Sequence, residues 1–142
     1  MRGLTNLILI QALFSTISGV LMANMSLIGR LGVWFIYRDY GVLRVWWKTA
    51  LILLGIQLLL IFILWLGRQL LPAWGSRLFA GIFFIVGLVG VYFTYIDFTT
   101  TSHRLLKSDF HLGGYLVWLA WAISCIWFMV SPARKSPAPL SD

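Results

Sequence analysis

The chain has 142 residues, of which 61% are hydrophobic and 11% are charged, whereas charged residues make up about a quarter of an ordinary soluble domain. This composition excludes a globular protein with a solvated surface and indicates a chain that is surrounded by lipid. The net charge of +7 comes from Lys and Arg residues spread over all the predicted loops, so it indicates attraction to a membrane surface and not binding to nucleic acid.

The first apolar run covers residues 4–25. It is long enough to cross a bilayer, because about 20 mainly apolar residues span roughly 30 Å of hydrocarbon. A basic start followed by an apolar stretch is also typical of a signal peptide. However, this stretch is long, and the residues before Asn24 form a poor cleavage site of the small-x-small kind. We therefore expect an uncleaved membrane helix.

The segment Ser26–Lys48 is too apolar for a free loop and too charged for a membrane span. Its basic residues alternate with aromatic ones, a pattern that favours a segment lying in the membrane interface. We predict that this first loop is interfacial through Arg30, Trp34, Arg38, Arg44, Trp46, Trp47 and Lys48. The turn sequence "YRDYG" leaves two forms open, an interfacial helix and a short hairpin with the arms "VWFI" and "VLRVW".

Three further apolar runs, over residues 46–66, 77–97 and 112–130, have the length of a span. The alternation at period two that marks a transmembrane barrel is absent. The stretch "GRQLLPAWGSR" between the second and third spans is rich in glycine and proline, which is typical of a short turn between antiparallel neighbours. The sequence therefore predicts an all-α integral membrane protein with four transmembrane helices in an antiparallel bundle. We expect residues 1–130 to form one domain and residues 131–142 to form a disordered, Pro-rich tail.

Small and polar residues are expected where membrane helices touch, because lipid supplies no hydrophobic force for their association. The third and fourth spans carry such residues at helical spacing, namely Ala80, Gly87, Gly90 and Gly114. A polar face is predicted within the membrane from Gln11, Ser15 and Ser18 of the first span together with Gln57 of the second. We expect these side chains to form hydrogen bonds between helices; a path for a ligand or an ion is the alternative.

The stretch "TYIDFTTTSHRLLKSDFH" holds two of the four acidic residues and both histidines. We predict a polar cluster at the membrane boundary, with Arg104 as the partner of Asp97, formed by Asp97, His103, Arg104, Asp109 and His111. His103 and His111 lie eight positions apart, which does not place them on one helix face and argues against a shared metal site. A solvated, charge-balanced cap is expected, with some capacity to bind a polar headgroup, a quinone or a partner.

Motifs for nucleophilic, metal or nucleotide chemistry are absent from the sequence. We therefore predict no catalytic residue and no cofactor. The expected function is that of a small multi-spanning protein of a bacterial inner membrane, a non-catalytic accessory or partner-binding subunit of a membrane complex. One alternative is a small oligomeric transporter or channel, including one of dual topology. Another alternative is a quinone- or lipid-linked redox or enzyme subunit.

The orientation in the membrane is weakly specified. Five Lys and Arg residues fall on the side of the termini and six on the other, which together make the eleven of the chain, so the positive-inside rule does not decide. The Pro-rich tail and the aspartates of the loops favour cytoplasmic termini. The expected partners are the lipid bilayer and another membrane protein or a second copy of the chain.

Overall fold

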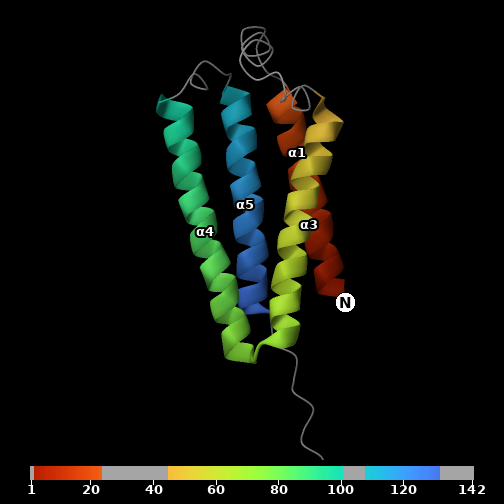
Figure 1. Ribbon diagram of the computed structural model, residues 1–142. Helices are drawn as coiled ribbons and strands as arrows, with labels where there is room; N and C mark the ends of the chain where they lie inside the picture. Colours follow the sequence, from red (N-terminus) through yellow and green to blue (C-terminus); the bar gives the residue numbers. More distant parts are fainter. Residues whose placement is uncertain (1, 24–44, 101–107, 132–142) are drawn as a thin grey trace, which may run out of the picture.

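The computed structural model describes residues 2–23, 45–100 and 108–131, and this part of the chain folds into four α-helices (Figure 1). They are α1 (Arg2–Ala23), α3 (Trp46–Leu70), α4 (Ala73–Thr100) and α5 (Ser108–Val130). Each is long and apolar enough to cross a membrane. The prediction of four long apolar helices is therefore confirmed. The predicted first loop up to Arg44 and the tail from residue 132 lie outside the described residues.

A helix suits this composition because backbone N–H and C=O groups in lipid must find hydrogen-bond partners within the chain. The threonine hydroxyl groups also find their partners within their own helix. The hydroxyl groups of Thr16 and Thr100 donate to the carbonyl oxygens of Ala12 and Ile96, four residues earlier, at 2.8 and 2.6 Å. Such polar side chains add no unsatisfied group to the outer face of a span.

The turn between α3 and α4 is very short. Leu71 has an extended backbone with φ −103° and ψ 151°, as expected for a residue that precedes proline. Pro72 has no N–H to continue α3, but its carbonyl oxygen accepts a hydrogen bond from the amide of Ser76 at 2.9 Å. Both helices run further than the predicted spans, because Gly67 and Gly75 lie inside them and only the proline interrupts the helix.

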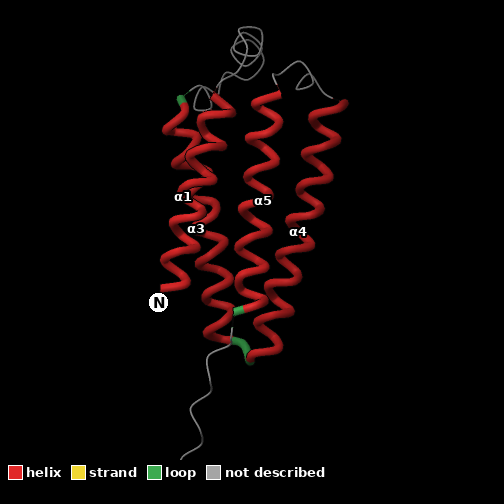
Figure 2. Tube along the Cα trace, turned by 180° about the vertical axis from the view of Figure 1, so that it is seen from behind, coloured by secondary structure: helices red, strands yellow, loops and turns green. Residues whose placement is uncertain are grey.

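Helix α5 holds the molecule together, since it contacts each of the other three helices. α1 also packs along α3, whereas α1 and α4 do not touch within the described part of the chain. α3 and α4 meet at their turn and diverge away from it (Figures 1 and 2). We call the end with this turn the turn end, and the opposite end, with Trp46 and Thr100, the loop end.

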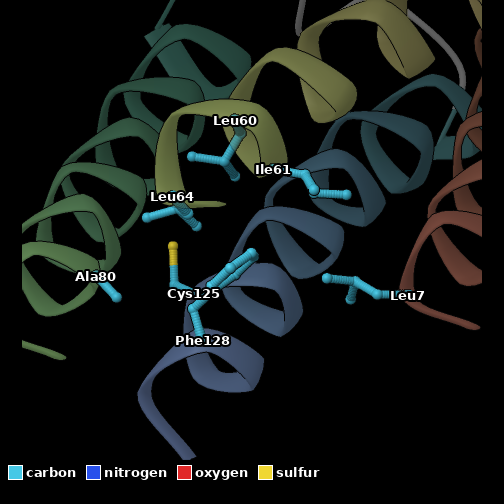
Figure 3. Close-up of a cluster of buried hydrophobic side chains, with 7 residues drawn as sticks. All are labelled: Leu7, Leu60, Ile61, Leu64, Ala80, Cys125 and Phe128. Carbon is cyan, nitrogen blue, oxygen red and sulfur yellow. The ribbon is translucent and has the colours of Figure 1, made fainter. Parts of the chain in front are cut away.

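The apolar core lies towards the turn end (Figure 3). Cys125 and Phe128 of α5 face side chains from the three other helices, namely Leu7, Leu60, Ile61, Leu64 and Ala80. A second, smaller cluster lies at the loop end, where Phe98 packs on Phe110 with Met22 and Tyr115 beside them. The bundle is thus closed tightly at one end, while the other end is filled by aromatic rings.

Candidate functional site

A pocket of about 250 Å³ lies at the loop end. All four helices contribute to its wall. The lining consists of Met22 from α1, Leu53 from α3, Thr94, Asp97 and Phe98 from α4, and Phe110, Gly114, Val117 and Trp118 from α5. Because α4 touches neither α1 nor, away from the turn, α3, the pocket lies where the bundle is least tightly closed.

One wall of the pocket is fixed by Trp118. Its indole Nε1 donates a hydrogen bond to Thr94 Oγ1 at 2.9 Å. Its ring lies against Gly90, where any side chain would collide with it. Trp118 is half-buried, and a tryptophan whose N–H is satisfied and whose ring is packed keeps one orientation, so this wall is preorganised.

Aromatic rings gather around Phe98 at the mouth of the pocket. The ring of His111 stacks on Phe98 with 4.4 Å between centroids and 22° between planes. Phe110 and Tyr115 meet the same ring edge to face, at 5.9 and 5.7 Å. These contacts fix the end of α4 against the start of α5.

The pocket combines π faces with hydrogen-bond acceptors. Asp97 is the ionisable residue among the described residues of its lining, and it lies half-buried near the end of α4. Thr94 Oγ1 accepts from Trp118 and so keeps its own proton for donation. The described part of the lining is therefore mainly apolar and aromatic, with one carboxylate at its edge.

The predicted polar cluster at the boundary is described only in part. Asp97 and His111 both lie at the loop end, and each takes part in interactions within the chain. Asp109 belongs to the first turn of α5. His103 and Arg104 lie outside the described residues, so the pairing of Asp97 with Arg104 stays a prediction. Among the residues that the structure describes, no group of three His, Cys, Asp or Glu side chains could hold a metal ion.

The polar residues within the membrane are buried between α1, α3 and α5. Gln11 Nε2 donates to the carbonyl oxygen of Ala120 and to Ser124 Oγ, both at 2.9 Å. Gln57 Nε2 donates to the carbonyl oxygen of Val117 at 2.9 Å. The two amides therefore join α1 and α3 to neighbouring turns of α5.

Four oxygen atoms of this region have no hydrogen-bond partner among the described residues. They belong to Gln11 (Oε1), Gln57 (Oε1), Ser15 (Oγ) and Ser18 (Oγ), all buried. We call these four residues the polar seam. An amide oxygen can only accept a hydrogen bond, whereas a serine hydroxyl can also donate one.

The small residues of α4 face α5. A Cβ added to Gly87 would lie 2.6 Å from Trp121 Cδ1, and Trp121 Nε1 donates to the carbonyl oxygen of Phe83 at 2.9 Å. Ala80 belongs to the apolar core. The ring of Phe98 lies directly against Gly114 of α5, where a Cβ would be 2.9 Å from Phe98 Cζ. Large rings from one helix thus occupy the space that small residues leave on the other.

The first turn of α3 carries the described part of the predicted interfacial set. Trp46, Trp47 and Lys48 are exposed, and Lys48 Nζ lies 5.5 Å from the centroid of the Trp47 ring. That distance is within the range of a cation–π contact. Arg30, Trp34, Arg38 and Arg44 lie outside the described residues.

Several functional residues were not predicted from the sequence, because they lie on the helix opposite the residues that were predicted. Ser124 was not part of the predicted polar face, nor were Phe98, Phe110 and Trp118 assigned to a pocket. Gly113, where α1 approaches α5 closely, was also missed. A signal was present, because Gly113, Ala120 and Ser124 recur at steps of seven and four and form a small face.

Comparison with protein-family models, with curated proteins and with solved structures finds no match for this chain.

Proposed function

We propose that this chain is a multi-pass protein of a bacterial inner membrane that binds another membrane protein and catalyses no reaction of its own. The observation that carries the proposal is the weak coverage of α4. It is the longest helix, with 28 residues. Only 11% of its most apolar stretch is buried, against 33%, 28% and 28% in α1, α3 and α5.

Weak coverage leaves much of α4 free to pack against another protein. Membrane helices associate through van der Waals packing, hydrogen bonds and small residues, since lipid tails are as apolar as leucine. α4 receives such contacts from α5 along its length, and from α3 at the turn. A span of this length with a single main neighbour leaves one flank available for a helix of another protein.

The composition of this flank favours a different protein over a second copy. The outward residues of α4 are large and exposed, namely Ile82, Ile85, Val86, Val89 and Phe93, while Gly87 and Gly90 turn towards α5. In a two-fold dimer the same bulky surface would meet itself. Close approach between membrane helices requires small residues, so the partner helix supplies them.

Site-specific photocrosslinking in membranes tests the proposal. A photoreactive residue at Ile85 should give crosslinks to one membrane protein. The control is Leu59 of α3, which is equally exposed, 59% against 61%. Purification in mild detergent with mass spectrometry should then recover the same protein in stoichiometric amount. Equal crosslinking at both positions, or crosslinks to lipid alone, would contradict the proposal. A crosslink between two copies of the chain would show that α4 binds a second copy and not another protein.

The finer arrangement belongs to the same proposal. In the membrane the four helices form an antiparallel bundle, the first loop lies in the interface and both termini are cytoplasmic. Support comes from the short turn between α3 and α4 and from the tryptophans exposed at the start of α3. Labelling from each side of the membrane tests this arrangement.

Two other functions have a specific observation in their favour. The polar seam favours a small oligomeric transporter or channel, because unpartnered oxygen atoms within a span suit a hydrated path. The pocket at the loop end favours a lipid- or quinone-linked subunit. The partner-binding function ranks first because the amides of the polar seam bond helix to helix, which is the usual role of such residues.

A further inference from the structure

We propose that the pocket at the loop end binds the ammonium head of an amphiphile, with Asp97 as its counter-ion and Trp118 and Phe98 as its aromatic walls. The ammonium group belongs either to a zwitterionic lipid or to a free apolar amine. This proposal stands on the pocket alone and does not depend on the partner-binding function.

The place of the pocket suits such a ligand. Asp97 lies three residues from the end of α4, at the level where the apolar helix gives way to the polar third loop. Lipid headgroups and their ammonium groups occupy the same level. The apolar body of the ligand would lie along the apolar helices outside the pocket.

The charge of the described lining favours a cation. Among the described residues that line the pocket, Asp97 is the charged one. It also interacts elsewhere in the chain, but a carboxylate accepts about four hydrogen bonds, so it retains acceptor positions. An anionic head would be repelled, and a neutral head would gain less than a cation from the carboxylate.

The aromatic walls strengthen this selection. The face of an aromatic ring attracts a cation within about 6 Å, most strongly for tryptophan and more so when the cation leaves water. Trp118 is held in place by its hydrogen bond to Thr94, and Phe98 by the rings around it. Both rings are therefore held in place before a ligand binds.

The size of the pocket limits the ligand to its head. About 250 Å³ equals the liquid volume of roughly eight water molecules at about 30 Å³ each. That space holds a substituted ammonium group but not a long alkyl chain. The remainder of the ligand must lie along the helices, as expected for an amphiphile.

Calorimetric titration of the purified full-length chain in a nonionic detergent tests the proposal. The probe is octyltrimethylammonium, and octyl sulfate is the control of opposite charge. We expect saturable binding of the cation alone. Asp97→Asn should weaken it by about tenfold, as loss of an ion pair near 1.4 kcal/mol implies, whereas Asp142→Asn in the tail should not. Binding of octyl sulfate or a short-chain quinone with equal affinity, or an unchanged affinity in Asp97→Asn, would overturn the proposal.

A second pair of variants keeps the test valid if Asp97→Asn fails to fold. Leu53→Phe adds bulk to the pocket wall while the carboxylate remains, so it should abolish binding. Leu51→Phe adds the same bulk on the exposed face of the same helix and should bind as the unaltered chain does. Equal binding by the two variants would contradict the proposal.

Nanodiscs distinguish the two sources of the ammonium group. If the ligand is a lipid, discs containing phosphatidylethanolamine should compete with the probe and lower its apparent affinity, relative to discs of phosphatidylglycerol alone. If the ligand is a free amine, the affinity should be the same in both discs. Either result supports an ammonium site, and failure of the probe to bind in both discs excludes one.

Discussion

At the scale of single residues, the polar groups within the membrane explain how α1 and α3 stay attached to α5. Gln11 and Gln57 are fully buried, and each uses its amide N–H to bond a carbonyl oxygen of α5. In lipid such bonds contribute about 0.6 kcal/mol on average and up to about 1.7 kcal/mol. Each amide also leaves its own oxygen without a partner among the described residues, which reduces the net gain.

Substitutions of Gln11 should therefore follow a definite order. Gln11→Leu should cost about 1 kcal/mol of unfolding free energy in detergent. Gln11→Glu should cost more, about 3 kcal/mol, because both variants lose the donor to the carbonyl oxygen of Ala120 but only Glu adds an ionisable group within the span, which is expensive. Denaturant titration followed by circular dichroism measures both values. Thr16→Val is the control, since that exposed hydroxyl bonds only within its own helix. A Gln11→Leu variant as stable as the unaltered chain would contradict this role of the amide.

Glycines of the spans differ sharply in what surrounds them. A Cβ at Gly90 would collide with the indole ring of Trp118, whereas a Cβ at Gly55 would meet nothing within 4 Å. Gly90→Ala should therefore destabilise the bundle by about 1–3 kcal/mol through overpacking. Gly55→Ala should be neutral or slightly stabilising, because alanine is the better helix former. Thermal unfolding of both variants in the same detergent gives the comparison, and equal midpoints would show that Trp118 does not lie on Gly90.

At the scale of helices, the sequence was sufficient to predict the spans but not how they pair. Length and hydropathy identify a span because the bilayer thickness requires them. Length and hydropathy do not tell which face of a helix is turned towards its neighbours, because lipid-facing and buried residues are both apolar. Ile85 and Leu64 are similar in the sequence, but Ile85 is exposed and Leu64 is buried. Small and polar residues carry the remaining information. They placed Gln11, Ser15 and Ser18 on one face, and all three are buried.

What the sequence could not supply was the identity of the opposing residue. The pocket depends on side chains from four helices, and the boundary cluster was read as a local run of charges. Its strongest described features are instead the stacking of His111 on Phe98 and the bond from Trp118 to Thr94. Such pairs depend on the depth and rotation of each helix, which packing sets.

The attachment of α4 is the weakest feature at this scale, and Trp121 is central to it. Its ring lies against Gly87, its Nε1 bonds the carbonyl oxygen of Phe83, and it stacks on the Phe83 ring at 6.4 Å. Trp121→Leu should cost about 3 kcal/mol by loss of packing and of this bond. Trp74→Leu, at a position 75% exposed, should change the unfolding free energy by less than about 0.5 kcal/mol. Similar losses in both variants would mean that α4 is held by something other than Trp121.

At the scale of the whole molecule, the two ends of the bundle differ in their build. The turn end is closed by the apolar core and by the short turn at Pro72. The loop end carries the aromatic cluster, the pocket and the exposed tryptophans at the start of α3. Binding of a small ligand is therefore expected at the loop end, whereas the closed turn end contributes to stability.

This difference yields a topological prediction that labelling of single cysteines can check. In the proposed arrangement the turn end is cytoplasmic, so a membrane-impermeant maleimide added to intact cells should label Ser108→Cys and not Gln69→Cys. Permeabilised cells should show labelling at both positions, while Ile85→Cys in the middle of α4 should stay unlabelled, because thiolate formation requires water. The native Cys125 gives little background, since it is fully buried.

Labelling of Gln69→Cys alone in intact cells would show that the orientation is the opposite one. Labelling of half the molecules at each of the two positions would establish insertion in both directions, and would favour the oligomeric transporter over the partner-binding subunit.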